Sequence, residues 1–424
     1  MVDRPHTPVA KRAVFYIPGY DPIHPRRYRE LYRTESAAQA EISGYGISLT
    51  ARQGGARYGW DVKGLIDGAD VDASVDVLVW SDIVRGSMDT SIPATYLQLL
   101  RTAWVYIGSG ALWRLMRLRK GPVLAALYPV AMLLTQFLLA VLIFGVVRRL
   151  LEAAFGLLAF SVYFKRESPA WFDLTSGFLA VAGGAAAFIW LMRWFKAKDA
   201  KFFAYYLMHD YAFGAATRGA NTPALEARMA EFGDAIAQAL ASDVDEVLVV
   251  GHSSGAHLGV SVLADLIRSG RVAADGPALG FLSLGQVVPM VSFLEHAHRL
   301  RGDLAYLSAS DALTWVDVTA PGDGCAFALC DPVAVSGVAP AGKRWPLVFS
   351  AAFTESLTPA RWKALRWRFF RLHFQYMCAF DAPRDYDYFR ITAGPLTLAD
   401  RYRNRPPSKS RIEKPVNKFT STAP

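Results

Sequence analysis

The sequence predicts an α/β protein with a mostly parallel sheet flanked by helices, into which a pair of membrane-spanning helices is inserted. Short apolar runs alternate along the chain with segments of helical spacing, a pattern typical of parallel strands covered on both faces. Two long stretches without a charged residue predict the insertion, in a chain of 424 residues of which 53% are hydrophobic. No repeat at a fixed period is visible.

The first strand is predicted at residues 13–17, where a short apolar run ends at Pro18-Gly19 and opens into a turn. Similar runs predict buried strands at residues 75–80, 246–250 and 313–318. Helical spacing of apolar residues predicts helices over residues 26–42 and 225–240. Strands and helices of this kind on both sides of the insertion predict one body made of residues 9–100 and 196–400.

The insertion is predicted at residues 101–195. Residues 121–147 and 174–192 carry no charge, and each stretch is long enough for a helix that crosses a bilayer core of about 30 Å. We therefore expect transmembrane helices near 122–147 and 174–194. Residues 177–187 are rich in Gly and Ala, which allow close approach of a second helix and favour a helical hairpin. Residues 151–164 either lie along the membrane interface or extend the first helix.

The net charge of +9 is concentrated beside the apolar stretches and in the tail after residue 401, which favours anionic lipid over nucleic acid as the partner. Five Lys and Arg residues precede the first stretch (101–120) and four follow the second (193–201), against four in the connection, at Arg148, Arg149, Lys165 and Arg166. This bias, with no signal peptide in the first twenty residues, predicts an integral membrane protein whose body, residues 9–100 and 196–400, is cytoplasmic. The tail, residues 401–424, is predicted to be disordered or a surface-bound strap.

Three cysteines occur, at 325, 330 and 378, without a CxxC pair or a histidine cluster. This spacing predicts neither a disulfide framework nor a zinc site, and we expect no cofactor.

The chemistry is expected at Gly251-His252-Ser253-Ser254-Gly255, where a predicted strand runs directly into a Gly-x-Ser-x-Gly motif and a helical segment. In this context the serine occupies a tight, strained turn, and the two glycines avoid collisions with the neighbouring strand and helix. The result is an exposed hydroxyl at a helix N-terminus.

These residues resemble the nucleophile elbow of the α/β-hydrolase superfamily, in particular the lipases and esterases whose elbow reads Gly-His-Ser-x-Gly. The resemblance covers the elbow, the early strand and turn, and the order of the candidate partners; the membrane insertion lies outside it. It implies Ser253 as the nucleophile, followed along the chain by an acid and then by a histidine.

The acid is expected on the turn after the strand at 313–318, and Asp323 is the first choice, with Asp317 and Asp331 as competitors. The histidine is chosen by elimination. Of the eight histidines only His373 follows a suitable acid. The resemblance further implies an oxyanion hole made by the N–H of Ser254 and one N–H from the turn after the first strand, at Gly19 or Tyr20. That turn lacks the His-Gly dipeptide common in lipases.

Together these residues predict a membrane-anchored serine hydrolase that cleaves a lipid or another acyl ester through an acyl-enzyme. Acyl transfer and thioester hydrolysis by the same residues are alternatives. A catalytically silent scaffold that binds a partner is an alternative from another class.

Overall fold

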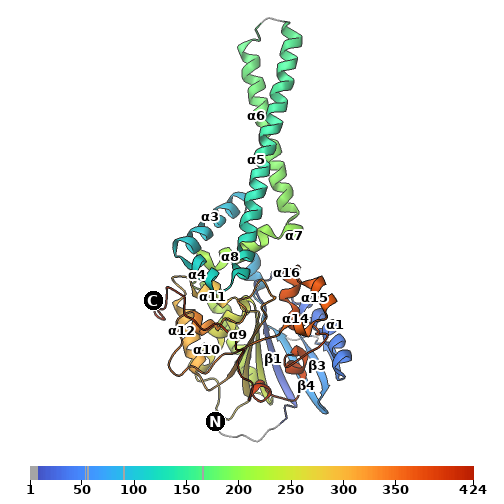
Figure 1. Cartoon of the computed structure of the whole chain (residues 1–424), viewed down its shortest axis with the longest axis vertical. Helices are drawn as coiled ribbons and strands as arrows, with labels where there is room; N and C mark the ends of the chain where they lie inside the picture. Colours follow the sequence, from blue (N-terminus) through green and yellow to red (C-terminus); the bar gives the residue numbers. More distant parts are fainter. Residues whose placement is uncertain (1–7, 53, 55–56, 89–90, 165–166) are drawn as a thin grey trace. The chain divides into compact units, whose positions relative to one another are not determined.

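The computed structural model describes residues 8–52, 54, 57–88, 91–164 and 167–424. The chain forms two compact units (Figure 1). The first, which we call the body, comprises Met1–Ser87, Ala103–Ala125 and Phe213–Pro424. The second, the helical unit, comprises Met88–Thr102 and Ala126–Ala212. Residues 103–125, predicted as part of the insertion, therefore belong to the body.

The body is built on one eight-stranded sheet of order β2-β3-β4-β1-β5-β6-β7-β8. Pairing is parallel from β4 through β1 to β8, whereas β3 is antiparallel to both β2 and β4. The strands are β1 (Lys11–Ile17), β2 (Gly46–Ala51), β3 (Gly59–Ile66), β4 (Ala69–Val77), β5 (Glu246–His252), β6 (Ala278–Leu284), β7 (Thr314–Thr319) and β8 (Leu347–Ser350). The α/β class is confirmed, and so are the strands predicted at 13–17, 246–250 and 313–318. The run predicted at 75–80 coincides with β4 only over residues 75–77. The strands β2, β3, β6 and β8 were not predicted.

Helices cover both faces of this sheet because the central strands are apolar on both faces. Every residue of β5 is buried. On one face α10 (Ser254–Arg268) contacts β1, β5 and β6, with α9 (Pro223–Leu240) and α12 (His298–Ala309) beside it. On the other face α17 (Tyr388–Ala393) contacts β1, β3 and β4. Figure 1 shows α10 and α12 on one side of the sheet and α1 (Arg26–Ser43) on the other. Both predicted helices, α1 and α9, are confirmed.

The other elements of the body are α4 (Ala111–Leu118), α11 (Val288–Ser292), α13 (Pro332–Val335), α14 (Phe353–Ser356), α15 (Pro359–Leu365), α16 (Phe369–His373), the 3-10 helix η1 (Gln375–Met377) and α18 (Leu398–Tyr402). The helical unit contains α7 (Asp199–Phe202), and α2 (Ser81–Met88), α3 (Ile92–Gly108) and α8 (Ala204–Ala216) each have residues in both units.

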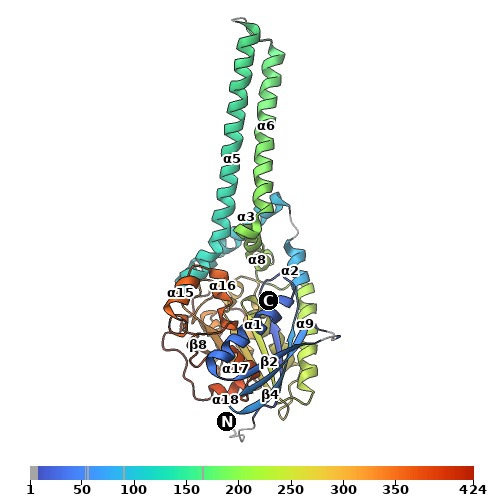
Figure 2. The same ribbon diagram turned by 90° about the vertical axis from the view of Figure 1, so that its right-hand side faces the viewer.

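The helical unit contains two helices that are long and apolar enough to cross a membrane, α5 (Lys120–Tyr163) and α6 (Ala170–Ala197). They lie side by side in both views (Figures 1 and 2). Close contact is possible because α6 carries glycine there: a Cβ on Gly183 would lie 2.4 Å from Leu151 Cδ1, and one on Gly184 would lie 2.9 Å from the Phe144 carbonyl oxygen. Of the two alternatives for residues 151–164, the structure shows the extension of the first helix, which reaches Tyr163.

Of the two alternatives predicted for the tail, disorder and a surface-bound strap, the structure shows a strap on the body. Ile412 forms a bridge with Cys330 and exchanges backbone hydrogen bonds with Leu329 and Asp331. Further along, the Asn417 amide donates to the Ser292 carbonyl oxygen, and Arg301 Nε donates to the Ser421 carbonyl oxygen at 2.7 Å. These hydrogen bonds hold a segment whose composition alone is typical of disorder.

Candidate active site

The candidate residues meet at the carboxyl edge of the sheet, where ligand sites of open α/β sheets are found. Gly19 follows β1, Ser253 follows β5 and Asp323 follows β7. His373 is the last residue of α16, after β8. Chain order in the sheet reverses at β1, whose neighbours are β4 and β5, so this edge includes a topological switch point.

Ser253 has the strained backbone expected of it, with φ 56° and ψ −120° at the junction of β5 and α10. Its N–H donates to the Leu284 carbonyl oxygen at 2.9 Å, which anchors the turn to β6. A Cβ on Gly255 would lie 2.1 Å from the Ile17 carbonyl oxygen, and one on Gly251 would lie 2.7 Å from the Gly255 carbonyl oxygen. Both glycines of the motif are therefore needed for steric reasons.

The turn after β1 lies directly against Ser253. A Cβ on Gly19 would lie 3.0 Å from Ser253 Cβ and 3.4 Å from its Oγ. Trp80 Nε1 donates to the Pro18 carbonyl oxygen at 2.9 Å and so holds this turn. Tyr20 is buried, with its ring 6.1 Å from that of Trp80.

Ser254, the other predicted oxyanion donor, is the first residue of α10. In the described part of the chain, no backbone hydrogen bond uses the N–H of Gly19 or of Ser254. Both donors therefore remain available beside the serine hydroxyl, as an oxyanion hole requires.

His373 and Asp323 form a buried pair, with Nδ1 of the imidazole 2.7 Å from Oδ2 of the carboxylate. The same Oδ2 accepts a hydrogen bond from the Tyr376 hydroxyl at 3.0 Å, and Oδ1 accepts one from the Cys325 N–H at 2.9 Å. Burial by itself would raise the pKa of Asp323, but the His373 interaction and these hydrogen bonds hold the pKa below its ordinary value. The carboxylate is thus the charged partner of the histidine.

The competing acids lie elsewhere. Asp317 accepts a hydrogen bond from Ser283 Oγ at 2.6 Å inside the sheet, and burial raises its pKa to about 8. Asp331 caps α13 and pairs with Lys343 Nζ at 2.7 Å. Of the three predicted acids, Asp323 is the one hydrogen-bonded to His373.

His252, which precedes the serine, supports the histidine segment. Its Nε2 lies 3.0 Å from the His373 carbonyl oxygen, and the two rings lie 4.7 Å apart. Burial, followed by repulsion from His373, lowers the pKa of His252 to about 3, so the ring is neutral at physiological pH. His252 therefore links the Ser253 turn to the segment that carries His373.

Ser253 and His373 are not themselves hydrogen-bonded: within the described ranges, no hydrogen bond joins Ser253 Oγ to the imidazole. Catalytic hydrogen bonds are often long in unliganded enzymes and shorten when substrate binds. Two consecutive residues connect Ser253 and His373. The Leu284 carbonyl oxygen accepts a hydrogen bond from the Ser253 N–H, and Gly285 lies against the His373 ring.

Two site residues were missed from the sequence, Tyr376 and Gly285. Tyr376 lies three residues after His373, a spacing that places both on one side of a helical turn. Gly285 has φ +53°, and a Cβ there would lie 3.0 Å from His373 Cε1 and 2.7 Å from Tyr376 Cε2. The signal for Gly285 was a glycine directly after an apolar run.

Cys325 adds a thiol to this group, because its Sγ and the ligand atoms of Asp323 and His373 lie within 4.8 Å of one another. These three types of side chain can bind zinc. However, two ligand atoms on a tetrahedral zinc ion would lie about 3.3 Å apart. The 2.7 Å between His373 Nδ1 and Asp323 Oδ2 instead fits a direct N–H···O hydrogen bond.

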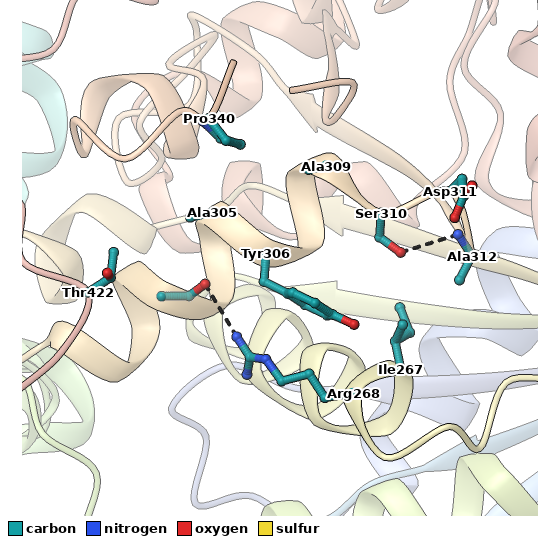
Figure 3. Close-up of a pocket in the computed structure, with 11 residues that line it drawn as sticks. Ile267, Arg268, Ala305, Tyr306, Ala309, Ser310, Asp311, Ala312, Pro340 and Thr422 are labelled. Carbon is teal, nitrogen blue, oxygen red and sulfur yellow. Dashed lines mark hydrogen bonds between the residues drawn. The ribbon is translucent and has the colours of Figure 1, made fainter. Parts of the chain in front are cut away.

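A separate hollow of about 700 Å³ lies near the other end of α10 (Figure 3). Arg268, the last residue of α10, and Tyr306 of α12 line it, with the guanidinium 4.4 Å from the ring centroid. Since α10 has 15 residues and begins beside Ser253, this hollow lies about 20 Å along the helix from the serine. It is not part of the candidate active site.

No protein-family model matches the chain, and comparisons with curated proteins and with solved structures found no match.

Proposed function

We propose that this chain is a serine hydrolase that cleaves a carboxylic ester, with Ser253 as nucleophile, His373 as general base and Asp323 as the acid that orients the histidine. The observation that carries the proposal is the buried His373–Asp323 hydrogen bond at the same sheet edge as the strained Ser253. A turn with a purely structural role requires neither a strained serine nor a buried His–Asp pair beside it. A catalytic nucleophile, in contrast, requires a base and a group that orients the base.

In the proposed reaction the Asp323 carboxylate accepts the Nδ1–H of His373, which leaves Nε2 unprotonated. Nε2 removes the proton from Ser253 Oγ as this oxygen attacks the ester carbonyl. The N–H groups of Ser254 and of Gly19 or Tyr20 stabilise the oxyanion. The imidazolium then protonates the leaving alcohol, and water, activated in the same way, hydrolyses the acyl-enzyme.

The substrate class follows from the two apolar helices. With α5 and α6 in a bilayer, the enzyme is anchored where acyl lipids are concentrated, so a lipid ester is the proposed substrate. The proposed cytoplasmic location of the body gains support from the extent of α5. Arg148 and Arg149 lie on this helix and not in the connection, which leaves Lys165 and Arg166 there against five and four basic residues on the outer flanks. Lys165 and Arg166 themselves lie outside the described residues.

The same residues would also serve acyl transfer or thioester hydrolysis, since both proceed through an acyl-enzyme. The competitor from another class is a silent scaffold. The experiment that separates them is labelling of the detergent-solubilised protein by a fluorophosphonate probe, with comparison of wild type, Ser253→Ala and His373→Ala after each is shown to be folded. Labelling that disappears in Ser253→Ala and falls in His373→Ala supports an activated nucleophile. Absence of labelling in folded wild type would replace the hydrolase with the scaffold.

A further inference from the structure

The middle of the helical hairpin carries three charged residues, all on α5. Arg148 Nε pairs with Glu152 Oε1 at 2.8 Å on the helix surface. Arg149 is exposed, and no ion pair of the described residues includes it. No other charged residue lies in α5 after Lys120. The hairpin therefore holds two cations and one anion within five consecutive positions of an apolar helix.

The packing of α5 on α6 places these charges at mid-depth. Gly183 is the central residue of the uncharged stretch 174–192. A Cβ on Gly183 would lie 2.4 Å from Leu151 Cδ1 and 4.0 Å from Val147 Cγ1. Because Arg148 and Arg149 lie between these two residues of α5, they are level with the centre of the uncharged stretch of α6. The same antiparallel register is seen where the two helices are joined: the ring of Tyr163, at the end of α5, lies 5.8 Å from the ring of Phe172, near the start of α6. When residues 174–192 of α6 span a bilayer, the charges of α5 lie near its midplane, and the part of α5 that spans with them is centred near Arg149 and not within the expected span at 122–147.

Arg149 faces away from α6. Val147 and Leu151, which contact α6, each lie two residues from Arg149, and two residues correspond to about 200° around a helix. Gly145, Arg149, Glu152 and Gly156 follow the spacing i, i+4, i+7, i+11 and so share one side of α5. We call this set the outward stripe. A Cβ on Gly145 or Gly156 would meet nothing within 4 Å.

The outward stripe is complementary to itself. It has one cation and one anion three residues apart, between two glycines that permit close approach of another helix. Copies inserted with the same sidedness present the stripe in parallel, and a two-fold axis then brings Arg149 of each copy to Glu152 of the other. Ionisable groups within membranes generally pair with one another in bundle interiors, because hydrocarbon cannot solvate them. A carboxylate can accept from both Arg148 of its own helix and Arg149 of the second copy.

We propose that two copies of this chain associate within the bilayer through the outward stripe, with reciprocal Arg149–Glu152 ion pairs. This inference rests on the membrane insertion included in the proposed function and is independent of the hydrolytic chemistry. The partner is thus a second copy of the same chain.

The test uses full-length protein, labelled with donor or acceptor dye and reconstituted in phosphatidylcholine vesicles. Energy transfer between copies reports association, and resistance to carbonate extraction reports insertion. We expect transfer for wild type, and about tenfold weaker self-association for Arg149→Glu and for Glu152→Arg, whose stripes carry one sign of charge. Mixing these two variants restores opposite charges across the interface and should restore transfer, which a merely unfolded variant could not do.

The glycines provide a matched pair of variants. Gly156→Leu should weaken association, whereas Gly177→Leu on α6, where a Cβ also meets nothing within 4 Å, should not. Wild type that resists carbonate but shows no transfer, or single variants that associate as wild type does, would overturn the proposed dimer alone. Wild type released by carbonate would overturn the membrane anchor. Fluorophosphonate labelling of Ser253 is independent of all these results, so the failure of each proposal can be recognised separately.

Discussion

Nδ1 of His373 lies 2.7 Å from Oδ2 of Asp323, although the two residues are 50 positions apart in the chain. Both side chains are buried, and Tyr376 and the Cys325 N–H donate to the same carboxylate. Such a carboxylate is held in one orientation, so it can hold the imidazole in one tautomer. The predictions below test this pair and the turns around it.

Replacement of Asp323 by Asn should lower the rate of ester hydrolysis or of fluorophosphonate labelling by about 10³–10⁴-fold. The amide cannot stabilise the imidazolium and favours the wrong tautomer. The matched control is Asp317→Asn, because the raised pKa of about 8 already keeps that carboxyl neutral at pH 7. Its labelling rate should stay close to wild type. The opposite ranking of the two variants would make Asp317 the acid.

Gly285→Ala should reduce labelling at least about tenfold while the protein still folds. The new Cβ would lie 3.0 Å from His373 Cε1 and displace the ring from the serine. Gly270→Ala is the control for backbone strain alone, since Gly270 also has positive φ, +69°, but a Cβ there meets nothing within 4 Å. Each variant should lose about 1 kcal/mol or more of stability. Equal labelling by the two would show that Gly285 has no part in placing His373.

Ser253→Gly should be more stable than Ser253→Ala by about 1–2 kcal/mol, because glycine adopts φ 56° with little strain whereas alanine does not. Both variants lack the hydroxyl, so neither should be labelled and the comparison isolates the backbone. Denaturant unfolding of the solubilised proteins gives the difference. An alanine variant as stable as the glycine variant would contradict a strained turn at this position.

The contribution of Asp317 to stability should fall as pH rises from about 4 to about 8. Its carboxyl has a pKa of about 8 in the folded protein, against an ordinary value of 3.8. Between these values the folded state holds a proton that the unfolded state has released, so a higher pH favours unfolding. Asp317→Asn removes this titration. Its free energy of unfolding, relative to wild type, should therefore be higher at pH 8 than at pH 5, by an amount on the order of a few kcal/mol. An identical pH dependence in both proteins would show that Asp317 is ionised in the fold.

Local sequence determined much of this protein. The apolar runs that became β1, β4, β5 and β7, the helices α1 and α9, the two long apolar helices and the Ser253 turn could each be predicted, because each depends on neighbouring residues. The strands β2 and β3 were not predicted because neither forms the continuous apolar run by which the predicted strands were identified: β2 alternates exposed and half-buried residues, and β3 alternates buried and exposed ones. The run that forms β6 had a recognisable apolar pattern but was not identified.

Only the tertiary structure decided which groups meet. The sequence left three candidate acids, Asp317, Asp323 and Asp331. Of these three, the fold brings only Asp323 into hydrogen-bond contact with His373. Tyr376 and Gly285 also contact this pair. Likewise, the charges on Arg148, Arg149 and Glu152 were visible in the sequence, whereas their depth depends on the register of α5 against Gly183. Periodicity specifies which face of an element is apolar, while the distance between residues far apart in the chain depends on how the faces pack.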